Sequence, residues 1–93
     1  MEIRGELLID EFIRRYPRSG SPLNKWIKEV KVAHWKNFSE LRQTFPSADY
    51  VAPYVVFNIG GNKFRLVVII IFSAEIVKVE KIMTHTQYDR WKP

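Results

Sequence analysis

Hydrophobic residues in the first half of the chain recur every three or four positions, as they do on one face of a helix. The first apolar stripe is Leu8, Ile9, Phe12, Ile13 and Tyr16. Pro17 ends it, because the residue before a proline is pushed out of the helical region. The second stripe is Leu23, Trp26, Ile27, Val30, Ala33 and His34. We therefore predict two amphipathic helices, with His34 as a partly buried core histidine.

Turn and cap residues place the boundaries of these helices. Ser21 suits the N-cap of the second helix, and Pro22 suits its first turn, where a missing N–H costs nothing. A short third helix is expected over residues 39–45, beginning at a serine and ending before Pro46.

The second half of the chain has the pattern of a sheet. Residues 54–59 are β-branched and aromatic, and Gly60, Gly61 and Asn62 supply the positive φ angles of a hairpin. A strand is expected over 63–72, whose unbroken apolar run indicates a central strand buried on both faces. After a turn at 73–75, a third strand follows over 76–83. The predicted fold is α+β, with two N-terminal helices packed on a twisted antiparallel β-sheet.

Composition narrows the class of protein. With 93 residues, of which 46% are hydrophobic, we expect one domain spanning 1–93. The absence of cysteine excludes a disulfide scaffold, a thiolate metal site and a cysteine nucleophile. The longest apolar run has seven residues, 66–72, against the roughly 20 of a membrane helix, and the charged N-terminus does not resemble a signal peptide. We expect a cytoplasmic protein with no membrane partner.

The charge of the chain favours a polyanionic partner. The net charge is +5, and nucleic acid is the first candidate for a basic domain of this size. Residues 54–93 hold six basic and three acidic groups, so the excess lies on the sheet and the C-terminal segment. The basic residues there are Lys63, Arg65, Lys78, Lys81, Arg90 and Lys92.

Two groups of residues have side chains suited to chemistry on a phosphate. Strand alternation places Lys63 and Arg65 on one face, and the planar guanidinium of an arginine holds a phosphate by two hydrogen bonds. The alternative is a solvated strand end with two ordinary surface cations. Further along, Thr84 can cap a helical turn that puts His85 and Tyr88 on one face, as candidates for acid–base work. The alternative there is a hydrogen-bonded histidine packed beside an aromatic ring.

Other kinds of site lack the residues they need. Two separated histidines without cysteine do not form a metal-ligand cluster, so we expect no metal and no cofactor. The Gly60–Gly61 pair lies in a hairpin and does not precede a helix, which excludes a phosphate-binding loop.

The order of these segments resembles the HigB toxins of bacterial type II toxin–antitoxin modules, within the RelE superfamily. The segments that carry the resemblance are 56–66, with Asn62-Lys63-Phe64-Arg65, and 83–89, with Thr84-His85-Thr86-Gln87-Tyr88. The helical segment from Leu23-Asn24-Lys25-Trp26 to Trp35-Lys36 is also similar. The resemblance covers essentially the whole chain.

The resemblance implies a RelE-like endoribonuclease that cleaves mRNA, typically on the ribosome, without a metal. Arg65 matches the family's strand arginine and would stabilise the phosphate, while His85 and Tyr88 would be the acid–base residues, in an order that stays open. Asn62, Lys63, Arg90 and Lys92 are the candidates for RNA contact. The chain departs from the family at Gly60, usually lysine, and at Met83, commonly glycine.

The implied partner is an antitoxin of the HigA type, with a helix-turn-helix domain, so that DNA is contacted only through the antitoxin. Two alternatives remain. One is a non-catalytic RNA- or ribosome-binding module that uses the same basic face. The other is a domain whose basic face binds only protein.

Overall fold

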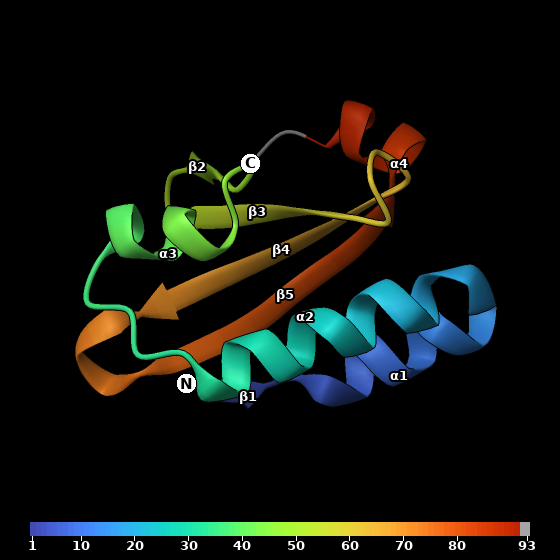
Figure 1. The fold of residues 1–93 in the computed structure, drawn as a ribbon. Coiled ribbons are helices and arrows are strands. Elements are labelled where there is room, and N and C mark those ends of the chain that lie inside the picture. The colour runs from blue at the N-terminus through green and yellow to red at the C-terminus, as the bar shows by residue number, and fades with distance from the viewer. Residues whose placement is uncertain (92–93) are drawn as a thin grey trace.

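The computed structural model describes residues 1–91 and consists of one sheet with helices on both faces (Figure 1). The elements in chain order are β1 (Glu2–Arg4), α1 (Glu6–Arg15), the 3₁₀ turn η1 (Pro17–Ser19), α2 (Gly20–Val32), α3 (Phe38–Thr44), β2 (Asp49–Val51), β3 (Tyr54–Ile59), β4 (Phe64–Ile71), the 3₁₀ turn η2 (Phe72–Ala74), β5 (Ile76–Thr84) and α4 (His85–Arg90). The α+β class and the packing of two N-terminal helices on the sheet are confirmed.

The sheet has two more strands than the sequence pattern predicts. Its order is β1-β5-β4-β3-β2, so β3, β4 and β5 form the expected antiparallel meander and β1 and β2 are added at the edges. Because β1 runs parallel to β5, the sheet is mixed, whereas β2 to β5 pair in the predicted antiparallel manner. Each edge strand has three residues, which is too short to display an alternating pattern.

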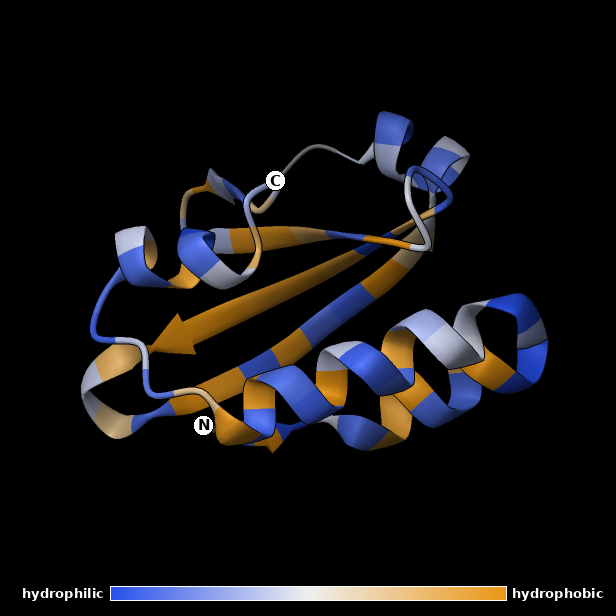
Figure 2. Cartoon of the chain, in the orientation of Figure 1, coloured by the Kyte–Doolittle hydropathy of each residue, from blue (hydrophilic) through white to orange (hydrophobic). Residues whose placement is uncertain are grey.

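Strand β4 is central and buried on both faces over Phe64–Val68, as predicted, and it is the most continuously hydrophobic strand in Figure 2. Leu66 and Val68 face the large core under α1 and α2, where Trp26 is 1% exposed. Val67 faces a small second cluster on the opposite side of the sheet, built with Val56, Met83, Tyr88 and Trp91. The second face is therefore covered by the C-terminal segment.

Helix boundaries differ from the predicted ones by a few residues. Helix α2 begins at Gly20, directly after η1, and its N-cap residue is Ser19, not Ser21. The Ser19 hydroxyl donates to the Tyr16 carbonyl (2.6 Å) and does not cap the helix. Pro22 lies in the first turn, as expected. Helix α3 begins one residue early, because the Asn37 side chain caps it by accepting from the Glu40 N–H (2.9 Å).

His34 is not a core residue, which corrects the sequence prediction. Helix α2 ends at Val32, so the helical stripe stops before His34. Its side chain is 79% exposed and its Nδ1 lies 2.7 Å from Oε1 of Glu75. That hydrogen bond lowers the pKa of the Glu75 carboxyl below its ordinary value. The pair is an exposed link between the segment after α2 and the turn before β5.

None of the helices within residues 1–91 combines the length and the apolar character needed to cross a membrane.

Candidate active site

The candidate site is built around Arg65, on the face of the sheet opposite α1 and α2. Alternation along β4 turns Phe64 and Leu66 toward the main core and Arg65 toward the second face. Arg65 pairs across the sheet with Asn58 of β3 and Met83 of β5. Its side chain is only 8% exposed, although it carries a permanent positive charge.

The guanidinium of Arg65 is held by groups that carry no negative charge. Nη1 donates to the Phe64 carbonyl (3.2 Å), and Nη2 donates to Oδ1 of Asn62 and approaches Nδ1 of His85 (3.2 Å). The carbon Cζ lies 5.5 Å from the centroid of the Tyr88 ring. Among the ion pairs of residues 1–91, none includes Arg65. A buried cation without a carboxylate partner is an open position for an anion.

The hairpin between β3 and β4 sets the position of Asn62. Gly60 and Gly61 have φ of 64° and 69°, as their pairing in the sequence predicted. The turn occupies residues 60–63, so β4 begins at Phe64. Lys63 thus precedes the strand, and strand alternation does not place its side chain beside that of Arg65. Lys63 is exposed, and its carbonyl accepts from the His85 N–H (2.9 Å).

Helix α4 carries the two acid–base candidates. Thr84 caps it, as predicted, with its side chain accepting from the Gln87 N–H (3.2 Å) while Gln87 Oε1 accepts from the Thr84 N–H (3.0 Å). This capping box lies where the β4–β5 ladder ends, at the Phe64–Thr84 pair. His85 and Tyr88, one turn apart, consequently both face Arg65.

The contacts of His85 indicate which ring nitrogen carries its proton. A guanidinium has only donors, so Nδ1 of His85 acts as the acceptor in the contact with Arg65. The proton then lies on Nε2, which is 3.4 Å from Oδ2 of Asp89. His85 is therefore oriented from both sides, and Asp89 is a site residue that the sequence analysis did not single out.

A cavity of about 390 Å³ opens beside Arg65 and Tyr88. Its other lining residues are Arg42, Pro46, Ser47, Ala48, Asp49, Val56 and Asn58. Neither Arg42 nor Asn58 was among the site residues predicted from the sequence. Asn58 could have been found as the only strongly polar residue of its strand pattern, 54–59, whereas nothing in the sequence brings Arg42 of α3 to this place.

The structure brings together some of the predicted site residues and not others. Arg65, His85, Tyr88 and Asn62 are in mutual contact through Arg65. Arg90 is exposed at the last position of α4. Lys92 lies outside the described residues. Within residues 1–91, no group of three or more His, Cys, Asp and Glu side chains is arranged to hold a metal ion.

Comparison with known proteins places this chain in a family. Residues 19–91 match the HigB toxin family, described as the RelE-like toxic component of a toxin–antitoxin system. The mRNA interferase toxin HigB of Escherichia coli K12 is 27% identical over 92 residues, covering 96% of this chain and 88% of that protein. The mRNA interferase HigB of Escherichia coli O6:H1 is 28% identical, covering 97% of this chain and 90% of that protein. The chain belongs to the HigB toxin family and is the RelE-like toxic component of a toxin–antitoxin system.

Proposed function

We propose that the chain is an endoribonuclease that cleaves mRNA and thereby inhibits translation. The observation that carries this proposal is Arg65, a buried cation without an acidic partner, in contact with a histidine and an aromatic ring. A phosphodiester supplies the missing negative charge at this position. The relatives named as mRNA interferases support RNA as the source of that phosphate.

The proposed reaction uses only side chains. The ribose 2′-hydroxyl attacks the adjacent phosphorus and the bond to the 5′-oxygen breaks, which leaves a 2′,3′-cyclic phosphate and a 5′-hydroxyl end. One proton leaves the 2′-oxygen and one is delivered to the 5′-oxygen, and His85 and Tyr88 are the groups placed to transfer them. Arg65 stabilises the negative charge that develops on the phosphate oxygens.

Asn62 and Asp89 act as positioning residues in this scheme. Asn62 holds one end of the guanidinium, so Arg65 is oriented before the phosphate arrives. Asp89, whose Oδ2 lies 3.4 Å from Nε2 of His85, keeps the ring turned toward Arg65. When a phosphate oxygen takes the hydrogen bonds of Arg65, Nδ1 of His85 is released to accept a proton.

The partners belong to the same proposal. As a toxin, the chain has an antitoxin partner, and we propose a HigA-type antitoxin whose helix-turn-helix domain makes any DNA contact. Lys63, Arg90 and Lys92 are proposed to contact RNA, and the substrate is proposed to be mRNA on the ribosome in the cytoplasm. The fold is proposed to form one domain over 1–93.

The test is growth arrest together with mapping of RNA ends. We expect Arg65→Ala and His85→Ala each to reduce cleavage of ribosome-bound mRNA by about 100-fold or more and to abolish growth arrest. His34→Ala is the matched control and should cleave like the wild type. His34 is exposed and contacts Glu75, which lies at the opposite end of β5 from His85.

The products decide between an enzyme and a binding module. New 5′-hydroxyl ends that require Arg65 and His85 support the enzyme. Salt-sensitive RNA binding that leaves the RNA intact supports the non-catalytic alternative. Full activity in both Arg65→Ala and His85→Ala would refute the site assignment.

A further inference from the structure

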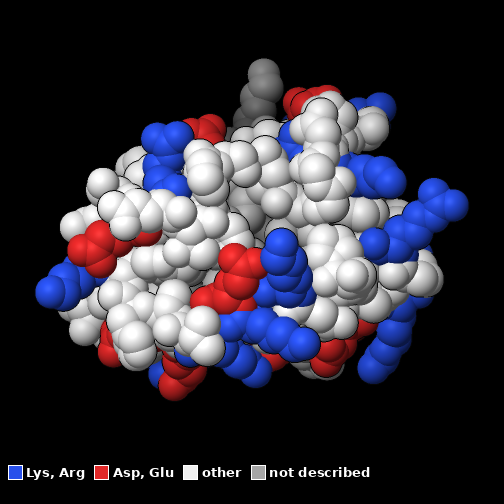
Figure 3. Space-filling model, in the orientation of Figure 1, with Lys and Arg blue, Asp and Glu red and all other residues white. Residues whose placement is uncertain are grey.

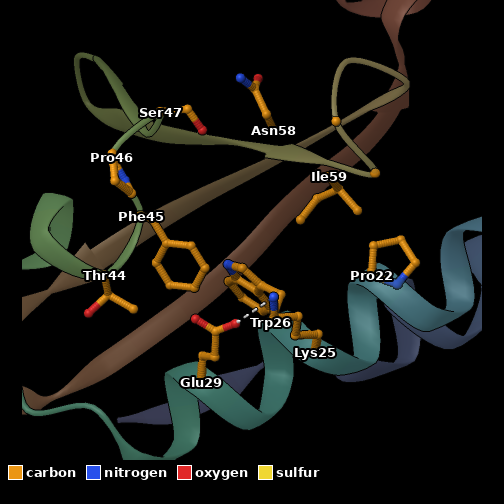
Figure 4. A pocket seen from close by; sticks show the side chains of 12 residues that line it. Pro22, Lys25, Trp26, Glu29, Thr44, Phe45, Pro46, Ser47, Asn58 and Ile59 are labelled. Carbon is orange, nitrogen blue, oxygen red and sulfur yellow. Dashed lines mark ion pairs between the residues drawn. The ribbon is translucent and has the colours of Figure 1, made fainter.

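A second cavity of about 360 Å³ lies beside the candidate site, between α2, the segment that follows α3, and the β3–β4 turn (Figure 4). We call it the α2–hairpin cleft. Its lining residues are Pro22, Lys25, Trp26, Glu29, Thr44, Phe45, Pro46, Ser47, Asn58, Ile59, Gly60 and Gly61. We propose that the α2–hairpin cleft binds a nucleobase of the RNA next to the phosphate that is cleaved. This inference rests on the proposed function and names a subsite of the same substrate.

The cleft adjoins the cavity beside Arg65. Pro46, Ser47 and Asn58 line both cavities, and Asn58 is the direct cross-strand partner of Arg65. In Figure 4 the Asn58 side chain points away from Trp26, so this residue forms the ridge between the two cavities. An RNA strand whose phosphate contacts Arg65 passes over this ridge, and a neighbouring base can then enter the cleft.

The walls of the cleft offer what a base requires. The rings of Phe45, Pro22 and Pro46 supply flat apolar surfaces for stacking, a contact that does not depend on duplex structure. Phe45 faces Trp26 across the cleft in Figure 4. In Figure 3 acidic and basic side chains meet near the middle of this face, and further basic side chains gather toward the side that carries the α1–α2 turn and the hairpin. Apart from Lys25 and Glu29, the residues that line the cleft are uncharged. An uncharged base therefore fits the interior and its phosphates fit the rim.

Backbone groups and one side-chain nitrogen along the cleft are available for hydrogen bonds with the edge of a base. Strand β2 pairs with β3 only from Tyr54 to Val56, so the outer edge of β3 at 57–59 has no strand partner among the described residues. Gly60 and Gly61 add backbone without side chains, which allows close approach. In addition, Trp26 Nε1 is the one buried side-chain nitrogen or oxygen without a hydrogen-bond partner in residues 1–91. A carbonyl oxygen of a base that reached the back wall would satisfy it.

Lys25 is the cation at the rim of the cleft. Its side chain is 80% exposed, and its ion pair with Glu29 is long, at 4.0 Å. Exposed pairs of this kind hold their partners weakly. Lys25 is therefore available to the RNA backbone, whereas Lys28, on the same helix, does not line the cleft.

Two matched pairs of variants test the inference. Pro22→Asp places a carboxylate in the cleft, and Ser21→Asp places the same charge on the exposed neighbouring position. On ribosome-bound mRNA, Pro22→Asp should lower kcat/KM about tenfold and weaken the base preference beside the cut, while Ser21→Asp stays within about twofold of wild type. Lys25→Ala should raise KM about threefold, and Lys28→Ala should not.

Crosslinking separates binding in the cleft from cleavage. The probe is ribosome-bound mRNA with a 2′-O-methyl group that blocks the attack and 4-thiouridine on either side of the blocked position. A crosslink mapped to Phe45 or Trp26 supports the inference, even if the wild-type chain cleaves no RNA. Equal cleavage and preference in Pro22→Asp and Ser21→Asp, without a crosslink in the cleft, would overturn it, even if the wild type cleaves. Loss of antitoxin binding alone in Pro22→Asp would also overturn it and assign the cleft to that protein.

Discussion

Arg65 is a buried cation that has no acidic partner among residues 1–91. Its guanidinium is almost completely buried, and its partners are a carbonyl, an amide and an imidazole. Such groups satisfy hydrogen bonds but do not neutralise the charge, so the free protein bears the cost of desolvating a cation. The sequence could single out Arg65, because it lies on a strand beside a hairpin and matches the strand arginine of the family that the chain resembles. The absence of an acidic partner could only be learned from the structure.

The first prediction is that Arg65→Met makes the protein more stable and inactive. Removing the buried charge should raise the free energy of unfolding by about 1 kcal/mol or more, since an apolar side chain of similar length can still pack against the Tyr88 ring. Chemical denaturation measures this change. Arg14→Met, at an exposed position of α1, is the control and should not raise stability. A loss of stability in Arg65→Met would mean that the arginine is structural.

Helix α4 is the element that places the two acid–base candidates beside Arg65. It has six residues, too few to be stable alone, and it is held by its capping box and by the contacts of Tyr88 and Trp91 with the second cluster. The capping pattern was visible in the sequence as Thr84 followed by Gln87. Trp91 packs against Tyr54 and Tyr88 and so fixes the end of this element.

The second prediction concerns this cap. Thr84→Ala removes the acceptor for the Gln87 N–H and should destabilise α4 by about 1 kcal/mol, with little effect on the rest of the fold. Hydrogen exchange over residues 85–90 should become faster, and cleavage should fall about tenfold because His85 and Tyr88 are less often in place. Thr86→Ala is the matched control on the same helix, and Thr84→Ser should restore the wild-type behaviour. Unchanged exchange in Thr84→Ala would contradict the role given to the cap.

Helices of several turns and strands with a long apolar pattern could be predicted from the sequence. The three-residue strands β1 and β2 could not. Strands β3, β4 and β5 lie within one residue of their predicted ends, since each buries several consecutive or alternating positions. Strand β1 buries only Ile3 between two exposed charged residues, so its pattern is the same as that of a loop. The error at His34 has a similar origin. The helical spacing of the second apolar stripe continues in the sequence for two residues beyond Val32, where the helix ends.

At the scale of the molecule, the sheet separates the large core from the candidate site at Arg65. One face is filled by the large core under α1 and α2, and the other carries Arg65, α4 and the cavity beside them. The β4–β5 ladder joins residues that are 20 positions apart, placing His85 next to Arg65. The sequence predicted that the C-terminal half would hold the site, but not that α3 and the segment after it would form its wall. That contribution depends on tertiary packing, which leaves no local pattern.

The last prediction follows from the charge of the whole molecule, which is +5. If cations around the site contact phosphates, RNA binding should weaken with salt, with a slope of about 0.7 per phosphate contact for a single strand. Lys63, exposed in the turn beside Asn62, is proposed to make one such contact, so Lys63→Ala should reduce the slope by about 0.7 to 1. Lys28→Ala removes an equal charge from α2 outside both cavities and should leave the slope unchanged.

The measurement is the binding of 2′-O-methyl RNA to ribosome-bound toxin between low and moderate salt, so that no cleavage intervenes. The difference between Lys63→Ala and Lys28→Ala is informative because both variants have the same net charge. If the salt dependence of RNA binding falls equally in both variants, binding depends only on the overall charge of the protein, and the hairpin does not contact the RNA. If only Lys63→Ala changes the slope, the phosphate chain runs past the hairpin, which is the direction required for a base to reach the α2–hairpin cleft.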